Sequence, residues 1–355
     1  MKQIPDVQFY KMKLKILSPT FIGSGETYNR CDYIKDEGKI YLINQEKWIE
    51  YLLEKNLLDK FTKYLEKMGK KTVIETWLRS ENQNVKQAIK RCTSTSFRAS
   101  VLDNFKSNEI HGFVKNIEGQ PYIPGSSIKG AIVSALIAYY LVKNKIRADE
   151  KELDEKELKK IKIPGISVSD STPFSTENLL VYKKKDGIVL HNDMKNNELP
   201  IYRECAIAGT EVEFSLRIDN KYIKENNIIR EKIDINKIYD VLYEKMQSLY
   251  DEQYGILTDY NKALDFIPGE AYNEADGYFD NGVFILGGGA GFHSKSILSS
   301  VYGYKDTMNK TKNILSKGIA RKHHHEKDDN TCPRALKLVD VGKKVYMGFC
   351  KIEEI

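Results

Sequence analysis

The chain has 355 residues, of which 41% are hydrophobic and 30% charged, and its formal net charge at pH 7 is +6, as is typical of a globular protein with a large core. Its longest charge-free helical candidate, residues 130–142, is shorter than the roughly 20 residues of a membrane span, so we expect a buried helix there. The N-terminus has no apolar stretch of signal-peptide length, and we therefore expect a cytoplasmic protein.

The N-terminal quarter begins with strands and continues with helices. Residues 9–17 alternate apolar residues with lysines, which is the two-residue period of a half-buried strand. A loop rich in Pro and Gly follows at 18–26, and residues 31–44 are typical of a hairpin that turns at 36–38. From 45 to about 89 apolar residues recur every three or four positions, which predicts a helical insertion that interrupts a sheet.

A second group of elements follows the insertion. The turn PYIPGSSIKGAI at 121–132 leads into an apolar helix that ends near Lys145, and the charged stretch 148–162 has the Glu-to-Lys spacing of an exposed helix. The remaining pattern predicts three strands, a polar loop or mobile hairpin, an amphipathic helix and a last apolar strand that ends in glycines. These are strands 166–170, 178–184 and 209–219, loop 183–198, helix 235–250 and strand 282–286.

Without the insertions, the main elements follow the order strand, helix, strand, strand, helix, strand. This order predicts an α+β fold with a ferredoxin-like, RRM-like βαββαβ core, whose open sheet is widely used for single-stranded RNA. We divide the chain into the first strand and hairpin of the core (1–44), the helical insertion (45–110), the remainder of the core with polar loop insertions (111–296) and a basic C-terminal segment (297–355). Residues 305–355 hold 12 Lys or Arg against 7 Asp or Glu, so the positive excess is mostly C-terminal and suits either a polyanion or solvent.

The turn at 121–132 has the composition of an anion site. Proline fixes one backbone angle, glycine permits unusual ones, and Ser126 or Ser127 is placed to cap the following helix. Main-chain N–H groups at the positive end of that helix, next to Lys129, favour a phosphate. The phosphate belongs either to a nucleotide or to a nucleic-acid backbone.

A second glycine cluster, LGGGAGFHSKS, lies at the end of the last apolar strand. It departs from the P-loop pattern only at Ser294, but too little chain follows it for the further strand and helix pairs of a P-loop sheet. We therefore favour contact with the backbone of one polymer, in which Phe292 stacks on a base and Lys295 neutralises a phosphate. A tight turn without a ligand is the plain alternative.

Both glycine motifs carry a resemblance to a known family. PYIPGSSIKGAI is similar to the signature of the RAMP superfamily of CRISPR RNA-binding proteins, and LGGGAGFHSK resembles the glycine-rich loop near the C-termini of RAMP proteins. SPTFIGSGE, ISVSD and AGTEVEFSL fit the same pattern, so the resemblance covers residues 11–296. With the late segment TCPRALKLVD, the second loop looks most like the family of fifth Csm subunits of type III-A CRISPR effector complexes.

This resemblance implies a structural subunit that binds crRNA without catalysis or cofactor, caps the 3′ side of the guide and supports crRNA maturation in antiviral defence. Its implied partners are the crRNA, target RNA through the guide, other Csm subunits, chiefly the backbone RAMP subunit, and as further candidates host maturation nucleases, with no membrane. Shape and phosphate contacts hold the guide while its bases read the target. The positions expected to bind RNA are Gly23, Ser24, Gly25, Gly125, Ser126, Ser127, Lys129, Gly287, Gly288, Gly289, Gly291, Phe292, Lys295, Arg321 and Lys322.

The alternative is a RAMP endoribonuclease acting on guide precursor or target RNA. Backbone relatives cut target RNA with an aspartate in the loop after the first strand, and Asp32 lies in the corresponding region, although NRCDYIKD lacks the glycines of those relatives. A lone carboxylate is more often a loop acceptor. His111 and His191 are the histidines to consider in a processing nuclease, but neither has a visible partner in the sequence.

The sequence gives no pattern for a metal or disulfide framework. Five cysteines are scattered without a C-x-x-C pair, which argues against disulfides and against a cysteine-rich zinc site. His323, His324 and His325 cannot all face one metal from a regular element, and Cys332 is the only soft ligand near them. We therefore expect no metal, and expect these histidines to contact phosphate or solvent.

Overall fold

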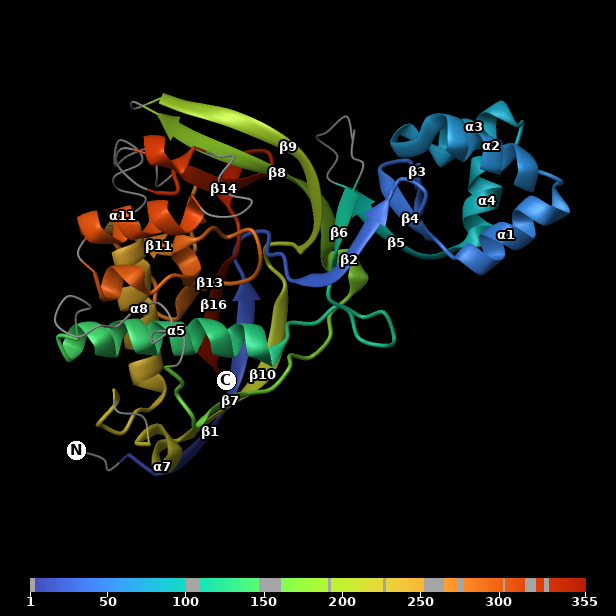
Figure 1. The fold of residues 1–355 in the computed structure, drawn as a ribbon. Coiled ribbons are helices and arrows are strands. Elements are labelled where there is room, and N and C mark those ends of the chain that lie inside the picture. The colour runs from blue at the N-terminus through green and yellow to red at the C-terminus, as the bar shows by residue number, and fades with distance from the viewer. Residues whose placement is uncertain are drawn as a thin grey trace.

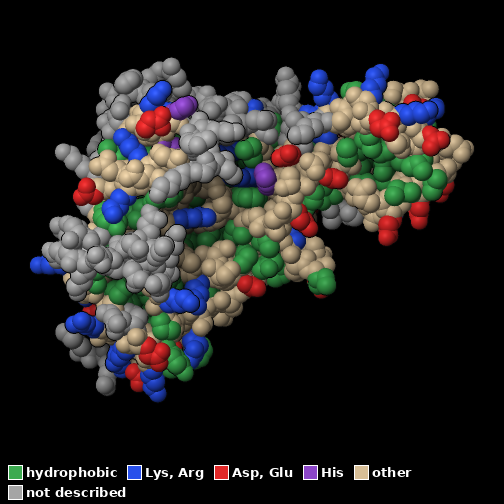
Figure 2. Space-filling model, in the orientation of Figure 1, with side chains coloured by type: hydrophobic (Ala, Val, Ile, Leu, Met, Phe, Trp, Pro, Cys, Tyr) green, Lys and Arg blue, Asp and Glu red, His purple; other side chains and the backbone are tan. Residues whose placement is uncertain are grey.

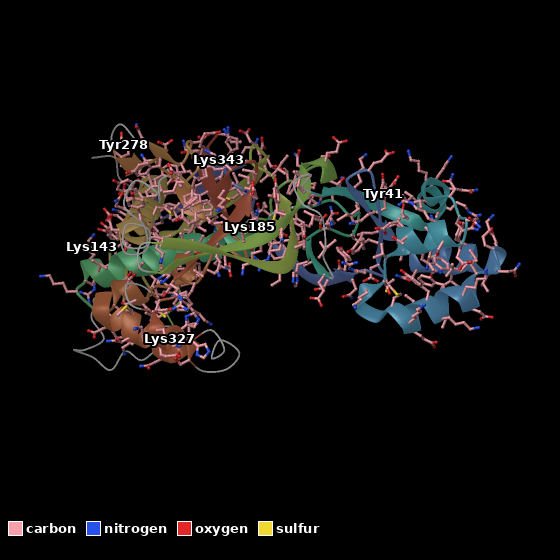
Figure 3. All side chains as sticks on the ribbon, turned by 90° about the horizontal axis from the view of Figure 1, so that it is seen from above. Tyr41, Lys143, Lys185, Tyr278, Lys327 and Lys343 are labelled. Atoms are coloured by element: carbon pink, nitrogen blue, oxygen red, sulfur yellow. The ribbon has the colours of Figure 1, made fainter. Side chains whose placement is uncertain are left out.

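The structure, a computed structural model, describes residues 4–99, 109–146, 161–190, 193–225, 228–251, 265–273, 277–302, 304–316, 324–328 and 332–355. In these residues the chain forms two large sheets with helices, which is a mixed α+β fold (Figure 1). A body holds most of the elements, and a helical lobe projects from it at one end (Figure 1). Figure 3 shows Tyr41 in this lobe, well apart from Lys143, Lys185 and Lys343 in the body.

The first sheet has five strands in the order β13–β16–β1–β10–β7, and each neighbouring pair is antiparallel. The strands are β1 (Val7–Ile16), β7 (Ile166–Val168), β10 (Glu211–Asp219), β13 (Val283–Ile285) and β16 (Phe349–Glu354). The predicted alternation is confirmed, because the apolar residues of β1 and β10 fill the core under two helices. These helices are α5 (Gly125–Lys143) and α8 (Ile235–Leu249), both close to their predicted bounds (Figure 1).

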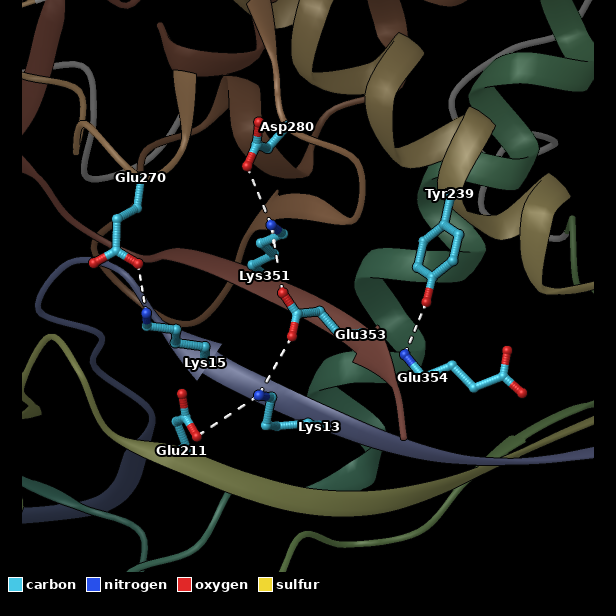
Figure 4. A network of polar contacts seen from close by, with 9 residues as sticks. All are labelled: Lys13, Lys15, Glu211, Tyr239, Glu270, Asp280, Lys351, Glu353 and Glu354. Carbon is cyan, nitrogen blue, oxygen red and sulfur yellow. Dashed lines mark hydrogen bonds and ion pairs between the residues drawn. The ribbon is translucent and has the colours of Figure 1, made fainter. Parts of the chain in front are cut away.

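The strand beside β1 is not the one that the sequence indicated. The segment expected as the last core strand forms β13, but β13 pairs outside β16, and β16 pairs with β1. Cys350 and Ile352 of β16 are buried, and the hydroxyl of Tyr239 in α8 accepts the backbone N–H of Glu354 at 3.0 Å (Figure 4). Part of the segment 297–355, assigned to a basic tail beyond the core, is therefore a central strand. Its apolar residues alternate with charges over too few positions to stand out in the sequence.

The face of this sheet that points away from α5 and α8 is neutralised by ion pairs. Lysines of β1 and β16 lie beside carboxylates of neighbouring segments, as Figure 4 shows for most of them. The pairs are Lys11 with Glu213, Lys13 with Glu211 and Glu353, Lys15 with Glu270, and Lys351 with Asp280 and Glu353. Because these cations are already engaged, this open face is a poor phosphate surface.

The second sheet links the body to the lobe in the order β2–β6–β9–β8–β5–β4–β3, with β14 pairing with β8 and β15. Its strands are β2 (Gly23–Asn29), β3 (Tyr33–Asp36), β4 (Lys39–Ile43), β5 (Thr93–Ala99), β6 (Glu109–Phe113), β8 (Leu179–Leu190), β9 (Asp193–Ala206), β14 (Ala335–Asp340) and β15 (Lys344–Tyr346). The predicted turn at 36–38 is confirmed by the pairing of Asp36 with Lys39. The predicted loop at 18–26 is wrong from Gly23 on, where β2 begins, and the polar stretch 183–198 belongs to the long β8–β9 hairpin.

The lobe has its own core. Four helices form it, α1 (Gln45–Glu54), α2 (Leu58–Met68), α3 (Ile74–Ser80) and α4 (Val85–Cys92), so the predicted helices are confirmed up to Cys92. The ring of Phe61 lies 4.7 Å from Trp77 and 5.3 Å from Trp48, centroid to centroid. Within the segment assigned as a helical insertion, β5 and the start of β6 then return the chain to the sheet.

α5 is the only helix of the described residues that is long and apolar enough to cross a membrane. Half of its apolar window is buried inside the protein, and Ile128, Ile132 and Leu136 have no exposed surface. It therefore has the burial of a core helix, as the sequence predicted. The charged helix expected at 148–162 lies almost entirely outside the described residues.

A buried ion pair offers a test of how the second sheet is stabilised. The side chain of Glu204 in β9 is fully buried, and its Oε2 accepts from the Phe113 N–H at 2.9 Å and from Lys115 Nζ at 2.7 Å. We predict that Glu204→Gln lowers the free energy of unfolding by about 1–3 kcal/mol in urea titrations, because the partly buried ammonium of Lys115 loses its counter-charge. Glu213→Gln, which breaks the exposed pair with Lys11, is the control and costs about 0–1 kcal/mol. Equal losses in the two variants would contradict this account.

Candidate nucleic-acid interface

The signature turn places the start of α5 directly against β7. The Gly125 N–H donates to Asp170 Oδ1 at 2.7 Å, and a Cβ on Gly125 would lie 2.3 Å from the Val168 carbonyl oxygen. Glycine is therefore required by close packing. The predicted cap is wrong, because Asp170 rather than Ser126 or Ser127 receives the first N–H of the helix. The carboxylate also offsets part of the positive helix end, so the anion site predicted there is weakened.

Lys129 keeps its charge available at this helix start. It forms no ion pair with the described residues, and Ser126 beside it in the first turn is exposed. The expected RNA contact of these two side chains therefore stays a prediction.

The two glycine loops lie side by side in the structure. We call residues 18–25, which run from the β1–β2 connection into the start of β2, the first glycine loop, and residues 287–291 the second. The Gly288 N–H donates to the Phe21 carbonyl oxygen at 2.6 Å. A Cβ on Gly287, which has a φ of +85°, would lie 2.3 Å from the same oxygen. Stretches that the sequence indicated as separate contacts thus form one structure, which we call the glycine junction.

Arg203 of β9 is the residue that sequence reasoning missed at the glycine junction. Its guanidinium carbon lies 5.1 Å from the centroid of the Phe21 ring, and a Cβ on Gly289 would lie 2.1 Å from its Nη1. Nε and Nη1 are buried without a hydrogen-bond partner, and the side chain forms no ion pair with the described residues. Burial lowers the pKa of Arg203, which expresses the cost of holding this cation partly out of water. An anion at this place would offset that cost.

Two lysines add to the positive charge near Arg203. Lys184 of β8 and Lys337 of β14 lie 3.2 Å and 3.1 Å from the same carboxylate, Asp186. Burial, and next the charge of Lys337, lower the pKa of Lys184. The second glycine loop reaches this group, because a Cβ on Gly291 would lie 3.6 Å from Lys337 Cγ. Three cations thus share one acid beside the glycine junction, which favours a phosphate.

His111 of β6 also faces the glycine junction. Its ring centroid lies 6.5 Å from that of Phe21, and its Nδ1 lies 3.3 Å from Thr27 Oγ1. Burial, and next the charge of Arg203, lower the pKa of His111, which favours the neutral ring, while the charge of Glu109 acts in the opposite direction and is the weakest of the three. Its hydrogen-bond partner among the described residues is the Thr27 hydroxyl, and a hydroxyl does not make an imidazole a strong base.

The other residues predicted for the site are spread over several positions. Gly23, Ser24 and Gly25 are exposed in β2, and Lys295 is exposed without an ion pair to the described residues. Phe292 is partly buried and packs against the main core, and its expected stacking on a base stays a prediction. The remaining candidates, Arg321, Lys322, His191 and His323, lie outside the described residues.

Asp32 has a structural task in the turn between β2 and β3. Its Oδ2 accepts the Asn29 N–H at 2.7 Å, and its own N–H donates to the Asn29 carbonyl oxygen. This is the loop-acceptor role that the sequence analysis weighed against catalysis.

The lobe carries acidic and basic side chains mixed together on the face shown in Figure 2. The cation excess at the glycine junction therefore does not continue over the lobe as a basic stripe on that face.

The protein thus has an α+β fold in which two glycine-rich loops meet beside a group of cations. These features define the class of protein with which we compared it. A family model described as "RAMPs: RAMP superfamily" matches residues 13–289, which is more than half of the chain. The chain belongs to the RAMP superfamily, and the resemblance that its motifs indicated is confirmed.

Curated relatives and a solved structure agree with this assignment. The chain is 28% identical over 232 residues to the CRISPR system Cms protein Csm5 of Enterococcus italicus, a match covering 59% of this chain and 60% of that protein. It is 29% identical to the Csm5 protein of Streptococcus thermophilus, over 59% of this chain and 64% of that protein, so these matches span less than two thirds of either relative. Its fold is similar, with a TM-score of 0.69 and 18% identity, to a chain in a cryo-EM structure of a Csm–crRNA–target RNA ternary complex of a type III-A CRISPR-Cas system. That likeness covers 98% of this chain and 100% of the other.

Two glycines of α5 give a matched test of the signature turn. We predict that Gly125→Ala lowers the free energy of unfolding by about 1–3 kcal/mol, because its Cβ meets the backbone of β7. Gly130→Ala, five residues along the same helix, meets open space and raises stability by about 0.5–1 kcal/mol. Thermal unfolding of both variants measures the difference, and a stable Gly125→Ala protein would show that the close approach is not required.

Proposed function

We propose that this chain is a crRNA-binding structural subunit of a type III-A CRISPR effector complex, which caps the 3′ side of the guide and supports crRNA maturation. Its proposed partners are the crRNA, target RNA paired to the guide, the other Csm subunits, chiefly the backbone RAMP subunit, and host maturation nucleases, all in the cytoplasm. The names of the relatives and the complex from which the similar chain comes support this proposal. The observation that carries it is the guanidinium of Arg203, whose buried Nε and Nη1 have no hydrogen-bond partner and which lies between Phe21 of the first glycine loop and Gly289 of the second.

The sheet supports a ferredoxin-like core for this subunit. If β16 is taken as the fourth strand, the order β16–β1–β10–β7 with α5 and α8 on one face has the antiparallel pairing of a βαββαβ unit. β13 is then an added edge strand. The open face of such a sheet commonly binds RNA, but here its lysines are engaged by carboxylates, so we place the guide at the glycine junction instead.

The proposed mechanism is binding to the sugar-phosphate backbone. Arg203 donates to a phosphate oxygen, and Lys184 and Lys337 add charge on one side. The main chain of the second glycine loop comes close to Arg203 and Lys337, because its glycines have no side chains that would keep it away from them. None of these groups reads a base edge, so the bases of the guide remain free to pair with target RNA.

Arg203 provides the sharpest test of this proposal. We predict that Arg203→Ala weakens binding of labelled crRNA about 10- to 100-fold, because a charge-assisted contact to a phosphate is lost. It also reduces the slope of log affinity against log salt by about 1. Arg217→Ala is the control, since Arg217 of β10 is paired with Asp219 and the variant removes the same net charge. If the two variants bind equally well, phosphate binding at the glycine junction is refuted.

The endoribonuclease alternative is tested with the same RNA. We predict that the purified chain retains labelled guide precursor and target RNA without cutting them, and that Asp32→Ala changes neither result beyond the small effect of a lost turn contact. Cleavage by the wild-type chain that Asp32→Ala or His111→Ala abolishes would instead establish a nuclease. A denaturing gel of the incubated RNA provides the measurement.

A further inference from the structure

Three side chains that lie close together in the sequence near the C-terminus converge in the structure. His325 begins the turn η7 (His325–Lys327), Asp328 follows it, and Cys332 precedes β14. His325 Nδ1 lies 2.9 Å from Asp328 Oδ2, and the Cys332 thiol is hydrogen-bonded to the same carboxylate. The nitrogen, oxygen and sulfur atoms all lie within 4.8 Å of one another, and Asp328 and Cys332 are buried.

We propose that His325, Asp328 and Cys332 form a binding site for one Zn²⁺ ion. A tetrahedral zinc ion with ligands at about 2.0–2.3 Å has neighbouring ligands about 3.3–3.8 Å apart, so only small shifts of these side chains are needed. A set of one imidazole, one carboxylate and one thiol suits zinc, whereas Mg²⁺ and Ca²⁺ require oxygen ligands. On binding, zinc replaces the thiol proton of Cys332, and His325 offers Nδ1 as the neutral ring nitrogen.

The surroundings favour a metal in two ways. Arg334 Nη1 lies 2.9 Å from Asp328 Oδ1, which orients the carboxylate and leaves Oδ2 facing His325. The thiolate and the carboxylate together offset the charge of a buried divalent ion. The fourth ligand is water or His293, whose ring is hydrogen-bonded to the backbone of Cys332 and whose Nε2 is buried without a partner.

This site differs from the one weighed and set aside from the sequence. It does not use three adjacent histidines, because His324 has a φ of +53° and an exposed side chain that pairs with Glu326. Of the two histidines that the structure describes in this run, only His325 joins the cluster, and the other two ligands lie further along the chain. Figure 3 places Lys327 of the same turn in the body, well away from the lobe. Zinc would link η7 to the start of β14, which is the strand that carries Lys337. The proposed ion would thus help to hold this strand, and with it one of the cations beside the glycine junction, in place.

The metal content of the full chain tests this proposal independently of RNA. The chain is purified without a polyhistidine tag, saturated with ZnCl₂, dialysed and analysed by inductively coupled plasma mass spectrometry. We expect about one zinc per chain in the wild type and in the control His324→Asn. We expect His325→Asn and Cys332→Ala to lose it, with circular dichroism reporting whether each variant is folded.

Loading with Co²⁺ in place of Zn²⁺ gives a spectroscopic readout on the wild-type chain itself, which remains informative when a variant does not fold. Wild-type chain loaded with Co²⁺ should show the intense near-ultraviolet band of a cobalt–thiolate bond, and folded Cys332→Ala should lack it. His293→Gln then separates the two choices of fourth ligand, because it weakens zinc binding only if His293 is a ligand. A wild-type chain that retains no zinc and shows no thiolate band, or a folded His325→Asn that binds as much zinc as His324→Asn, overturns the proposal.

Discussion

Close contacts between main chains, at positions where any Cβ would collide with a carbonyl oxygen, join segments of this protein that lie far apart in the sequence. Gly125 meets the end of β7, Gly287 meets Phe21, and Gly282 meets Ile352 of β16. At each of these positions a Cβ would lie 2.3 Å from a backbone oxygen, well inside van der Waals contact. Motifs that suggest ligand binding by their glycine content therefore have a packing task first. Any ligand contact is made by the groups that this packing brings together.

The open face of the first sheet and the glycine junction, the two surfaces considered for RNA, differ in their balance of positive and negative side chains. On the open sheet face, each lysine of β1 with an interior position in the strand lies beside a glutamate, and such exposed pairs hold little net attraction for an anion. At the glycine junction the balance is reversed, because Asp186 is the only carboxylate of the described residues that is paired with Lys184 and Lys337 or acts on Arg203. Partial burial strengthens this difference, since a desolvated cation interacts more strongly than a hydrated one. The same residue types thus produce a neutral face in one place and an excess of positive charge in another.

Local patterns predicted the parts of this fold that depend on local order. The alternation in β1 and β10, the helical periodicity of the lobe and the turn at 36–38 all lie within a few residues and were predicted from sequence. β16 was missed because its place beside β1 depends on a pairing across more than three hundred residues. Arg203 was missed because it lies in an ordinary strand between Tyr202 and Glu204, and only the approach of Phe21 and Gly289 makes it unusual. The family resemblance identified the two glycine loops, but it could not indicate that they touch.

The position of the glycine junction explains how a contact there can act on the whole molecule. Two of the crossings between the first sheet and the second lie between β1 and β2 and between β9 and β10. These two crossings run side by side, since Thr20 and Ala206 exchange backbone hydrogen bonds and the Gly209 N–H donates to the Ile16 carbonyl oxygen. The second glycine loop lies against the first of these crossings through Gly288, and Arg203 lies three residues before Ala206 on the other. A phosphate held at this point would contact both crossings at once, and would resist any movement of the lobe-bearing sheet relative to the body. The proposed role at the end of an assembly along RNA requires such a fixed relation between the surface that binds the strand and the core that supports it.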